Sequence, residues 1–186
     1  MHRPKVVIHC AAERFPDRCA SDPEGTRRLN VVATEHLARE CESRSAVLVY
    51  LSTDYVFAGT PGQAPYAADA TPSPPNFYGE TKLAGERAVL ATAPTVGVVL
   101  RVPVLYGDVE RNSESAVNTL LDAVWNRDGK KDVEVDAWSI RYPTNVEDVA
   151  RVLKDVADKY AAAAAQGCGQ PLPKLLQFSS EDRTTK

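Results

Sequence analysis

The sequence predicts an α/β fold in which a parallel sheet is covered by helices. Three short apolar runs, Val6–His9, Ala46–Leu51 and Val96–Arg101, have the continuous hydrophobicity of strands that are buried on both faces. Helical patterns separate these runs, and strands that alternate with helices form right-handed crossovers on a parallel sheet. The 186 residues correspond to about one domain.

The first half of the chain alternates helices with loops between these strands. A polar loop is expected over Glu13–Asp22, followed by a helix over Pro23–Glu42, since proline is tolerated in a first helical turn. The stretch Gly59–Pro75 is rich in Gly, Pro and Ala, which is typical of a long loop. A second helix is expected over Asn76–Ala91, where leucines and alanines form an apolar stripe.

The second half gives weaker patterns. A helix is expected over Asn112–Asn126, a short strand over Val133–Val135, a helix over Val146–Ala165 and a last strand over Leu175–Phe178. We assign residues 1–186 to one partial domain, in which residues 161–186 form a tail region.

The composition excludes several classes of function. A net charge of -3 provides no basic face for nucleic acid, and no apolar run approaches the ~20 residues that a membrane span requires. The first strand begins too early to leave room for a signal peptide, so a cytoplasmic protein is expected. The cysteines lack the paired spacing of a metal site and do not combine with the histidines, so we expect reduced thiols and no metal; they are Cys10, Cys19, Cys41 and Cys168.

Tyr78 and Lys82 stand four residues apart near the start of a predicted helix, so both project from one face. A phenol has a pKa near 10, and a neighbouring ammonium favours its ionised form, which makes it a better acid or base at neutral pH. Taken alone, however, the pair is a weak signal, and an exposed helical tyrosine beside a solvated lysine is its default interpretation.

Ser52 and Thr53 lie at the carboxyl end of a predicted strand, where ligands bind in open α/β sheets. A hydroxyl there can hydrogen-bond a substrate carbonyl and polarise it for hydride attack. The commoner role of such residues is to cap a turn or helix. The sequence leaves both roles open.

Three ordered blocks resemble the dTDP-4-dehydrorhamnose reductase branch of the extended short-chain dehydrogenases; they are Ser52–Phe57, Tyr78–Glu86 and Arg101–Gly107. Within that branch, further segments resemble the beta subunits of methionine adenosyltransferases; they are His9–Asp17, Glu114–Val117 and Arg141–Ala150. The resemblance implies an NAD(P)-binding, Rossmann-like, doubly wound parallel sheet.

The resemblance also implies roles for matching residues. Thr53 would polarise a carbonyl, Tyr78 would be the general acid, and Lys82 would assist Tyr78 and contact the cofactor ribose. Asn30 would support Lys82 through a water molecule, or be an ordinary residue of a helix face. The residues implied to bind NADP are Cys10, Ala11, Ala12, Arg14, Tyr78, Lys82, Pro103 and Leu105.

The sequence departs from the family at its beginning. The family starts with a strand and a Gly-rich turn that binds the cofactor phosphates, and none of the ten glycines here has that arrangement. The first strand corresponds to the fourth of the family. We therefore expect a truncated fold, without the N-terminal βαβ units and a C-terminal part.

Three functions remain open. The first is a regulatory, non-catalytic subunit that binds the catalytic subunit of methionine adenosyltransferase and modulates S-adenosylmethionine synthesis, with NADP as a ligand. The second is an NADP-dependent reductase of a 4-keto nucleotide sugar. The third is a truncated chain with neither activity. The beta-subunit-like segments favour the first.

Overall fold

The computed structural model describes residues 3–60, 62–125, 140–166 and 171–185. Its centre is a four-stranded parallel sheet in the order β1-β2-β3-β6. The strands are β1 (Val6–His9), β2 (Val47–Thr53), β3 (Gly97–Val102) and β6 (Leu175–Gln177). The predictions for these four strands are confirmed to within two residues at each end. The sheet places the carboxyl ends of all four strands at one edge.

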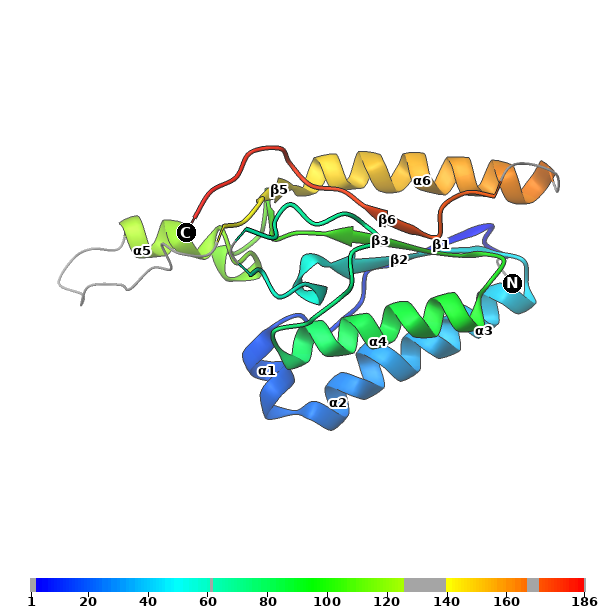
Figure 1. Ribbon diagram of the computed structural model, residues 1–186, viewed down its shortest axis with the longest axis horizontal. Helices are drawn as coiled ribbons and strands as arrows, with labels where there is room; N and C mark the ends of the chain where they lie inside the picture. Colours follow the sequence, from blue (N-terminus) through cyan, green and yellow to red (C-terminus); the bar gives the residue numbers. More distant parts are fainter. Residues whose placement is uncertain (1–2, 61, 126–139, 167–170, 186) are drawn as a thin grey trace.

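Helices cover both faces of the sheet (Figure 1). One face carries α1 (Pro16–Ser21), α2 (Pro23–Arg27), α3 (Thr34–Ser43) and α4 (Phe77–Thr92), and the other carries α6 (Val146–Gln166). The predicted fold class is therefore confirmed. Among the described residues, no helix is long and apolar enough to cross a membrane, and no group of three His, Cys, Asp or Glu side chains is placed to hold a metal ion.

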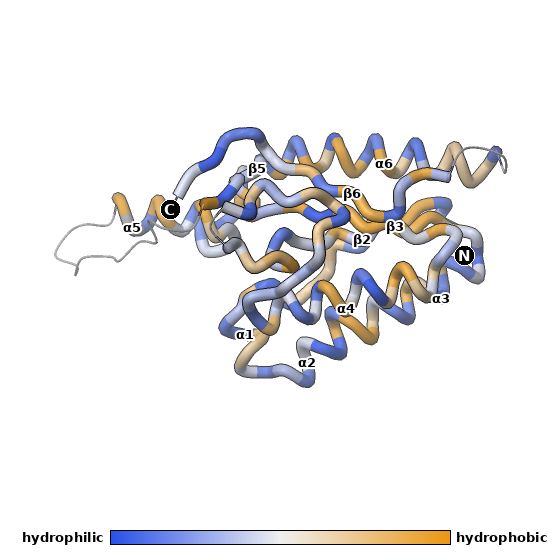
Figure 2. The backbone as a smooth tube through the Cα atoms, in the orientation of Figure 1, coloured by the Kyte–Doolittle hydropathy of each residue, from blue (hydrophilic) through white to orange (hydrophobic). Residues whose placement is uncertain are grey.

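The sheet separates two hydrophobic cores because successive residues of a strand point to opposite faces. Leu48 and Tyr50 of β2 pack with α3 and α4, whereas Val47 and Val49 pack with α6. Every residue of β3 is buried. The hydrophobic centre of the sheet between more polar helices is visible in Figure 2. This double burial explains the unbroken apolar runs in the sequence.

The first turn of α4 is held close to the end of β2. Asn76 caps the helix by accepting a hydrogen bond from the Gly79 amide at 2.9 Å. A Cβ at position 79 would lie 2.2 Å from the Tyr55 carbonyl oxygen, so only glycine permits this approach. The approach brings the helix that carries Tyr78 against the short 3₁₀ turn η2 (Asp54–Val56).

Several sequence predictions are corrected. The loop expected over Glu13–Asp22 contains α1, whose start at Pro16 follows the same first-turn rule as Pro23. The helix expected over Pro23–Glu42 is divided by a π-helical segment, η1 (Arg28–Ala33). Local periodicity does not distinguish a π turn from an α turn, because both place apolar residues on one face.

The region after β3 also differs from the prediction. Instead of one helix over Asn112–Asn126, it contains a 3₁₀ turn, η3 (Asn112–Glu114), and a short helix, α5 (Thr119–Trp125). A second small sheet pairs β4 (Leu105–Tyr106) with β5 (Thr144–Asn145). Strands of two residues have no periodicity to detect. The strand predicted over Val133–Val135 lies outside the described residues.

Candidate functional site

Thr53 and Tyr78 meet at the carboxyl edge of the sheet. Thr53 is the last residue of β2, and its hydroxyl accepts a hydrogen bond from the Tyr55 amide at 3.2 Å. The Tyr78 ring lies edge-on to the Tyr55 ring, with centroids 5.9 Å apart. Burial raises the pKa of Tyr78 to about 12, and a side-chain hydrogen bond with Thr53 opposes this shift. The Thr53 hydroxyl therefore caps a turn, which is the commoner of the two roles that the sequence left open. It also lies beside the phenol of Tyr78.

Lys82 is buried one helical turn further along α4. Its ammonium donates a hydrogen bond to the Leu51 carbonyl at 2.8 Å and lies 4.1 Å from the centroid of the Tyr50 ring. Burial lowers the pKa of Lys82 to about 8, and the charge of Glu86 opposes the shift. Burial is the largest cause of the raised pKa of Tyr78, and it acts against the shift toward neutrality expected from Lys82.

The segment after β1, which the resemblance implies to bind the cofactor, comes near Lys82. The charge of Lys82 acts on the thiol of Cys10, whose pKa burial raises overall. Cys10, Ala11 and Arg14 are exposed, and Ala12 is half-buried. The Arg14 guanidinium donates to the Glu114 carbonyl at 2.6 Å. The edge next to Lys82 is thus open and lined by small residues.

Asn30 fixes this segment to α4. Its amide oxygen accepts from the Glu13 amide at 2.8 Å, and its amide nitrogen donates to the Glu13 carbonyl at 3.0 Å and to the Thr81 hydroxyl at 3.1 Å. These contacts differ from the support of Lys82 that the resemblance implied. Asn30 belongs to η1, and π turns of this kind are frequent at functional sites. The observed role is to join the loop after β1 to the helix of Tyr78.

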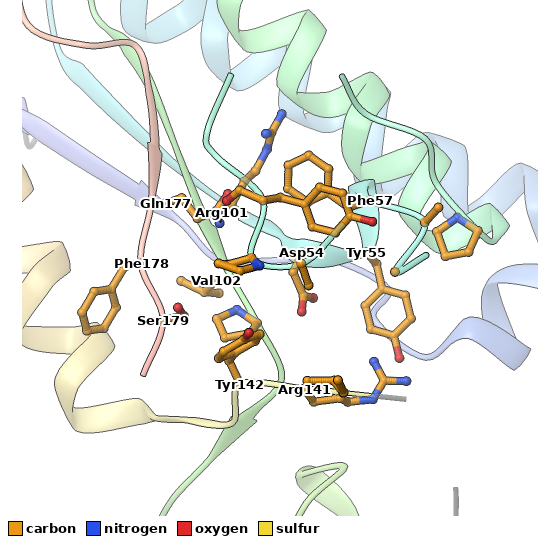
Figure 3. A pocket seen from close by; sticks show the side chains of 18 of the residues that line it. Asp54, Tyr55, Phe57, Arg101, Val102, Arg141, Tyr142, Gln177, Phe178 and Ser179 are labelled. Carbon is orange, nitrogen blue, oxygen red and sulfur yellow. Dashed lines mark hydrogen bonds between the residues drawn. The ribbon is translucent and has the colours of Figure 1, made fainter. Parts of the chain in front are cut away.

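A cavity of about 370 Å³ adjoins this edge (Figure 3). Its walls combine aromatic rings with polar groups, which is typical of a small-molecule site. Pro103 lines the cavity, whereas Leu105 packs on the core cluster shared with α6. The aromatic lining residues are Tyr55, Phe57, Tyr66, Tyr142 and Phe178, and the polar ones include Asp54, Asn76, Arg101, Arg141, Gln177 and Ser179.

The sequence of residues 1–185 matches the RmlD substrate binding domain family. The chain belongs to this family. Over 157 residues, it is 52% identical to methionine adenosyltransferase 2 subunit beta of Xenopus tropicalis, a match that covers 84% of this chain and 46% of that relative. The chain thus spans about half the length of the curated relatives it matches.

Solved structures agree with this membership. The dTDP-4-dehydrorhamnose reductase of Clostridium acetobutylicum matches with a TM-score of 0.80 and 28% identity, over 98% of this chain and 58% of that one. The Bacillus anthracis reductase, solved in complex with NADP, matches with a TM-score of 0.80 and 26% identity over the same shares. The predicted Rossmann-like architecture is therefore confirmed, in a chain that corresponds to part of those proteins.

In this RmlD-family chain, the cavity has a polar side formed by Asp54 and Arg141. Figure 3 shows the Arg141 guanidinium next to the Tyr55 side chain, and its centre lies 5.4 Å from the ring centroid. Burial raises the pKa of Asp54 to about 6, and the charge of Arg141 opposes the shift. The Nε atom of Arg141 is buried without a hydrogen-bond partner among the described residues. This side can therefore pair with an acceptor group of a ligand.

The substitution Asp54→Asn is expected to stabilise the protein at neutral pH. Because the pKa of Asp54 is higher in the folded state, the folded state binds more protons than the unfolded state between pH ~4 and ~6, and stability falls as the pH rises through this window. Asparagine removes that loss of stability. The free energy of unfolding of the variant should therefore exceed that of the parent by about 1–2 kcal/mol at pH 7 and by little at pH 4.

Urea unfolding at several pH values measures this difference. Asp69→Asn, which changes an exposed carboxylate in the neighbouring loop, serves as the control and should leave the profile unchanged. If Asp54→Asn raised the free energy of unfolding by the same amount at pH 4 and pH 7, the cause would not be the burial of an ionised carboxylate at this position.

Proposed function

We propose that this chain is part of a regulatory subunit of methionine adenosyltransferase, which binds the catalytic subunit and modulates S-adenosylmethionine synthesis. The observation that carries the proposal is the 52% identity to the Xenopus tropicalis beta subunit across 84% of the chain. Burial raises the pKa of Tyr78 to about 12, away from the range in which a general acid works best at neutral pH.

The site supports binding of the nicotinamide end of NADP. Tyr78 and Lys82 stand four residues apart on α4, and the segment after β1 that follows the same sheet edge contains the small residues Ala11 and Ala12. When bound in its reduced form, NADPH would supply a hydride at this edge. For the phosphates, the chain offers no Gly-rich turn in its sequence, so we propose that this chain by itself binds NADP weakly.

The proposal is tested by co-purification of this chain with a methionine adenosyltransferase catalytic subunit. We expect a stable complex by size-exclusion chromatography and a changed KM for methionine in the complex. Tyr78→Phe should leave both results unchanged, because the phenol hydroxyl lies at the cofactor edge and carries no step of the modulation. Absence of both the complex and the kinetic change would refute the proposal.

A second function is an NADP-dependent reductase of a 4-keto nucleotide sugar. It is favoured by the contact between Thr53 and Tyr78 beside a cavity with aromatic walls. The reductase reading predicts oxidation of NADPH in the presence of dTDP-4-keto-6-deoxy-hexose, and loss of that oxidation in Tyr78→Phe. The same variant thus separates the two functions, since only the reductase depends on the phenol.

A further inference from the structure

A fully buried ion pair lies behind the cavity. Glu86 of α4 and Arg101 of β3 are each 2% exposed, and the Arg101 Nη2 and Nε atoms donate to the two carboxylate oxygens of Glu86 at 2.6 and 2.8 Å. Ser52, the residue before Thr53, donates its hydroxyl to the same carboxylate at 2.6 Å. One carboxylate therefore joins α4, β2 and β3 at the edge where the candidate site lies.

The remaining nitrogen of Arg101 reaches the loop that forms one wall of the cavity. Its Nη1 atom donates to the Ala68 carbonyl at 3.0 Å, and its guanidinium lies 5.0 Å from the centroid of the Phe57 ring. Phe57 stacks on Tyr66 with centroids 4.4 Å apart. A single side chain thus contacts both the ion-pair network and the loop.

Few hydrogen bonds join the described loop residues, 57–60 and 62–75, to the rest of the fold, although Phe57 packs with Leu83 of α4, and Tyr66 and Ala70 pack against that cluster. The Ser73 amide donates to the Val56 carbonyl at 2.8 Å, and Gln177 of β6 donates to the Tyr66 carbonyl at 2.9 Å. Yet this loop supplies Phe57 and Tyr66 to the cavity wall. A buried ion pair seldom increases stability over apolar residues of the same size. The network therefore calls for a role other than stability.

We propose that Arg101 is a positioning residue that holds the loop wall of the cavity in place relative to α4, the helix that carries Tyr78 and Lys82. All its nitrogens are engaged, two by Glu86 and one by Ala68. The planar guanidinium can hold both partners at fixed angles, which a lysine ammonium cannot. This role rests on the contacts alone and does not depend on the proposed function.

The test is Arg101→Lys in the full chain, followed by hydrogen exchange. A lysine can neutralise Glu86 but cannot also reach Ala68. We expect exchange at the Ala70 and Ser73 amides to rise about tenfold, which corresponds to the loss of one hydrogen bond to a charged group. Exchange at the amides of β2 should stay at the parent rate, because Glu86 keeps a cationic partner.

A second variant removes any effect of an unpaired buried charge. The double substitution Glu86→Leu with Arg101→Met replaces the pair by apolar groups, so the thermal midpoint should stay close to that of the parent while the loop exchanges faster. Arg151→Lys, which alters an exposed arginine of α6, is the matched control. Loop exchange at the parent rate in both Arg101 variants would overturn the proposal, as would an equal rise throughout the sheet in both.

Discussion

Arg101→Ala is expected to lower the free energy of unfolding by about 3–5 kcal/mol, the largest single-residue loss that we predict for this chain. The substitution removes the direct ion-pair partner of the buried Glu86 carboxylate, which keeps the Ser52 hydroxyl as a hydrogen-bond partner and the charge of Lys82 nearby. Burying an ionised group that has lost its direct counter-charge carries a large desolvation cost. Denaturant unfolding at neutral pH measures the loss.

Two comparisons make this prediction specific. Lys154→Ala breaks the exposed pair with Asp158 on α6 and should change the unfolding midpoint too little to resolve. The double variant that replaces both Glu86 and Arg101 by apolar residues should recover most of the stability, because it removes the unpaired charge. If the double variant were as unstable as Arg101→Ala, lost packing and not the charge would be the cause.

Lys82→Met is expected to stabilise the protein by about 2 kcal/mol at pH 7. The pKa of Lys82 falls from 10.5 to about 8 in the folded state, so folding must hold a charged ammonium in an apolar site. The shift corresponds to roughly 3 kcal/mol, of which the lost hydrogen bond to the Leu51 carbonyl offsets about 1 kcal/mol. A methionine fills a similar volume without the charge.

The dependence on pH identifies the cause. Between pH ~8 and ~10.5 the unfolded state binds more protons at this residue than the folded state, so the parent gains stability as the pH rises through that window. The advantage of Lys82→Met should therefore shrink over the same range. Chemical unfolding at pH 7, 8 and 9.5 tests this. An advantage that does not vary with pH would show that packing and not charge separates the two proteins.

A residue that costs stability at its position is typical of a functional site. Lys82 and Asp54 are both held with shifted pKa values at the same edge of the sheet. In the regulatory proposal, a bound NADP would contact Lys82 and offset part of the free energy lost by burying its ammonium. The prediction for Lys82→Met thus tests whether the residue that would contact NADP also destabilises the free chain.

The sequence predicts the strands well because burial on both faces leaves an unbroken apolar run. The π-helical segment that carries Asn30 was not predicted, since its hydrophobic spacing is that of an ordinary helix. The Glu86–Arg101 pair did leave a signal in the sequence. A charged residue in a buried strand requires a buried partner, and Glu86 stands on the helix that directly precedes this strand.

The sequence by itself determined the order of strands and helices, and with it the convergence of Thr53 and Tyr78 at one edge, because the carboxyl ends of parallel strands meet there. Only the tertiary structure determined the direction in which the pKa values of Tyr78 and Lys82 shift. Whether Tyr78 is activated or made more inert depends on burial and on the partner that the ammonium of Lys82 selects, here the Leu51 carbonyl. The position of Arg141 at the cavity likewise depends on packing between distant segments, which local patterns of residues do not record.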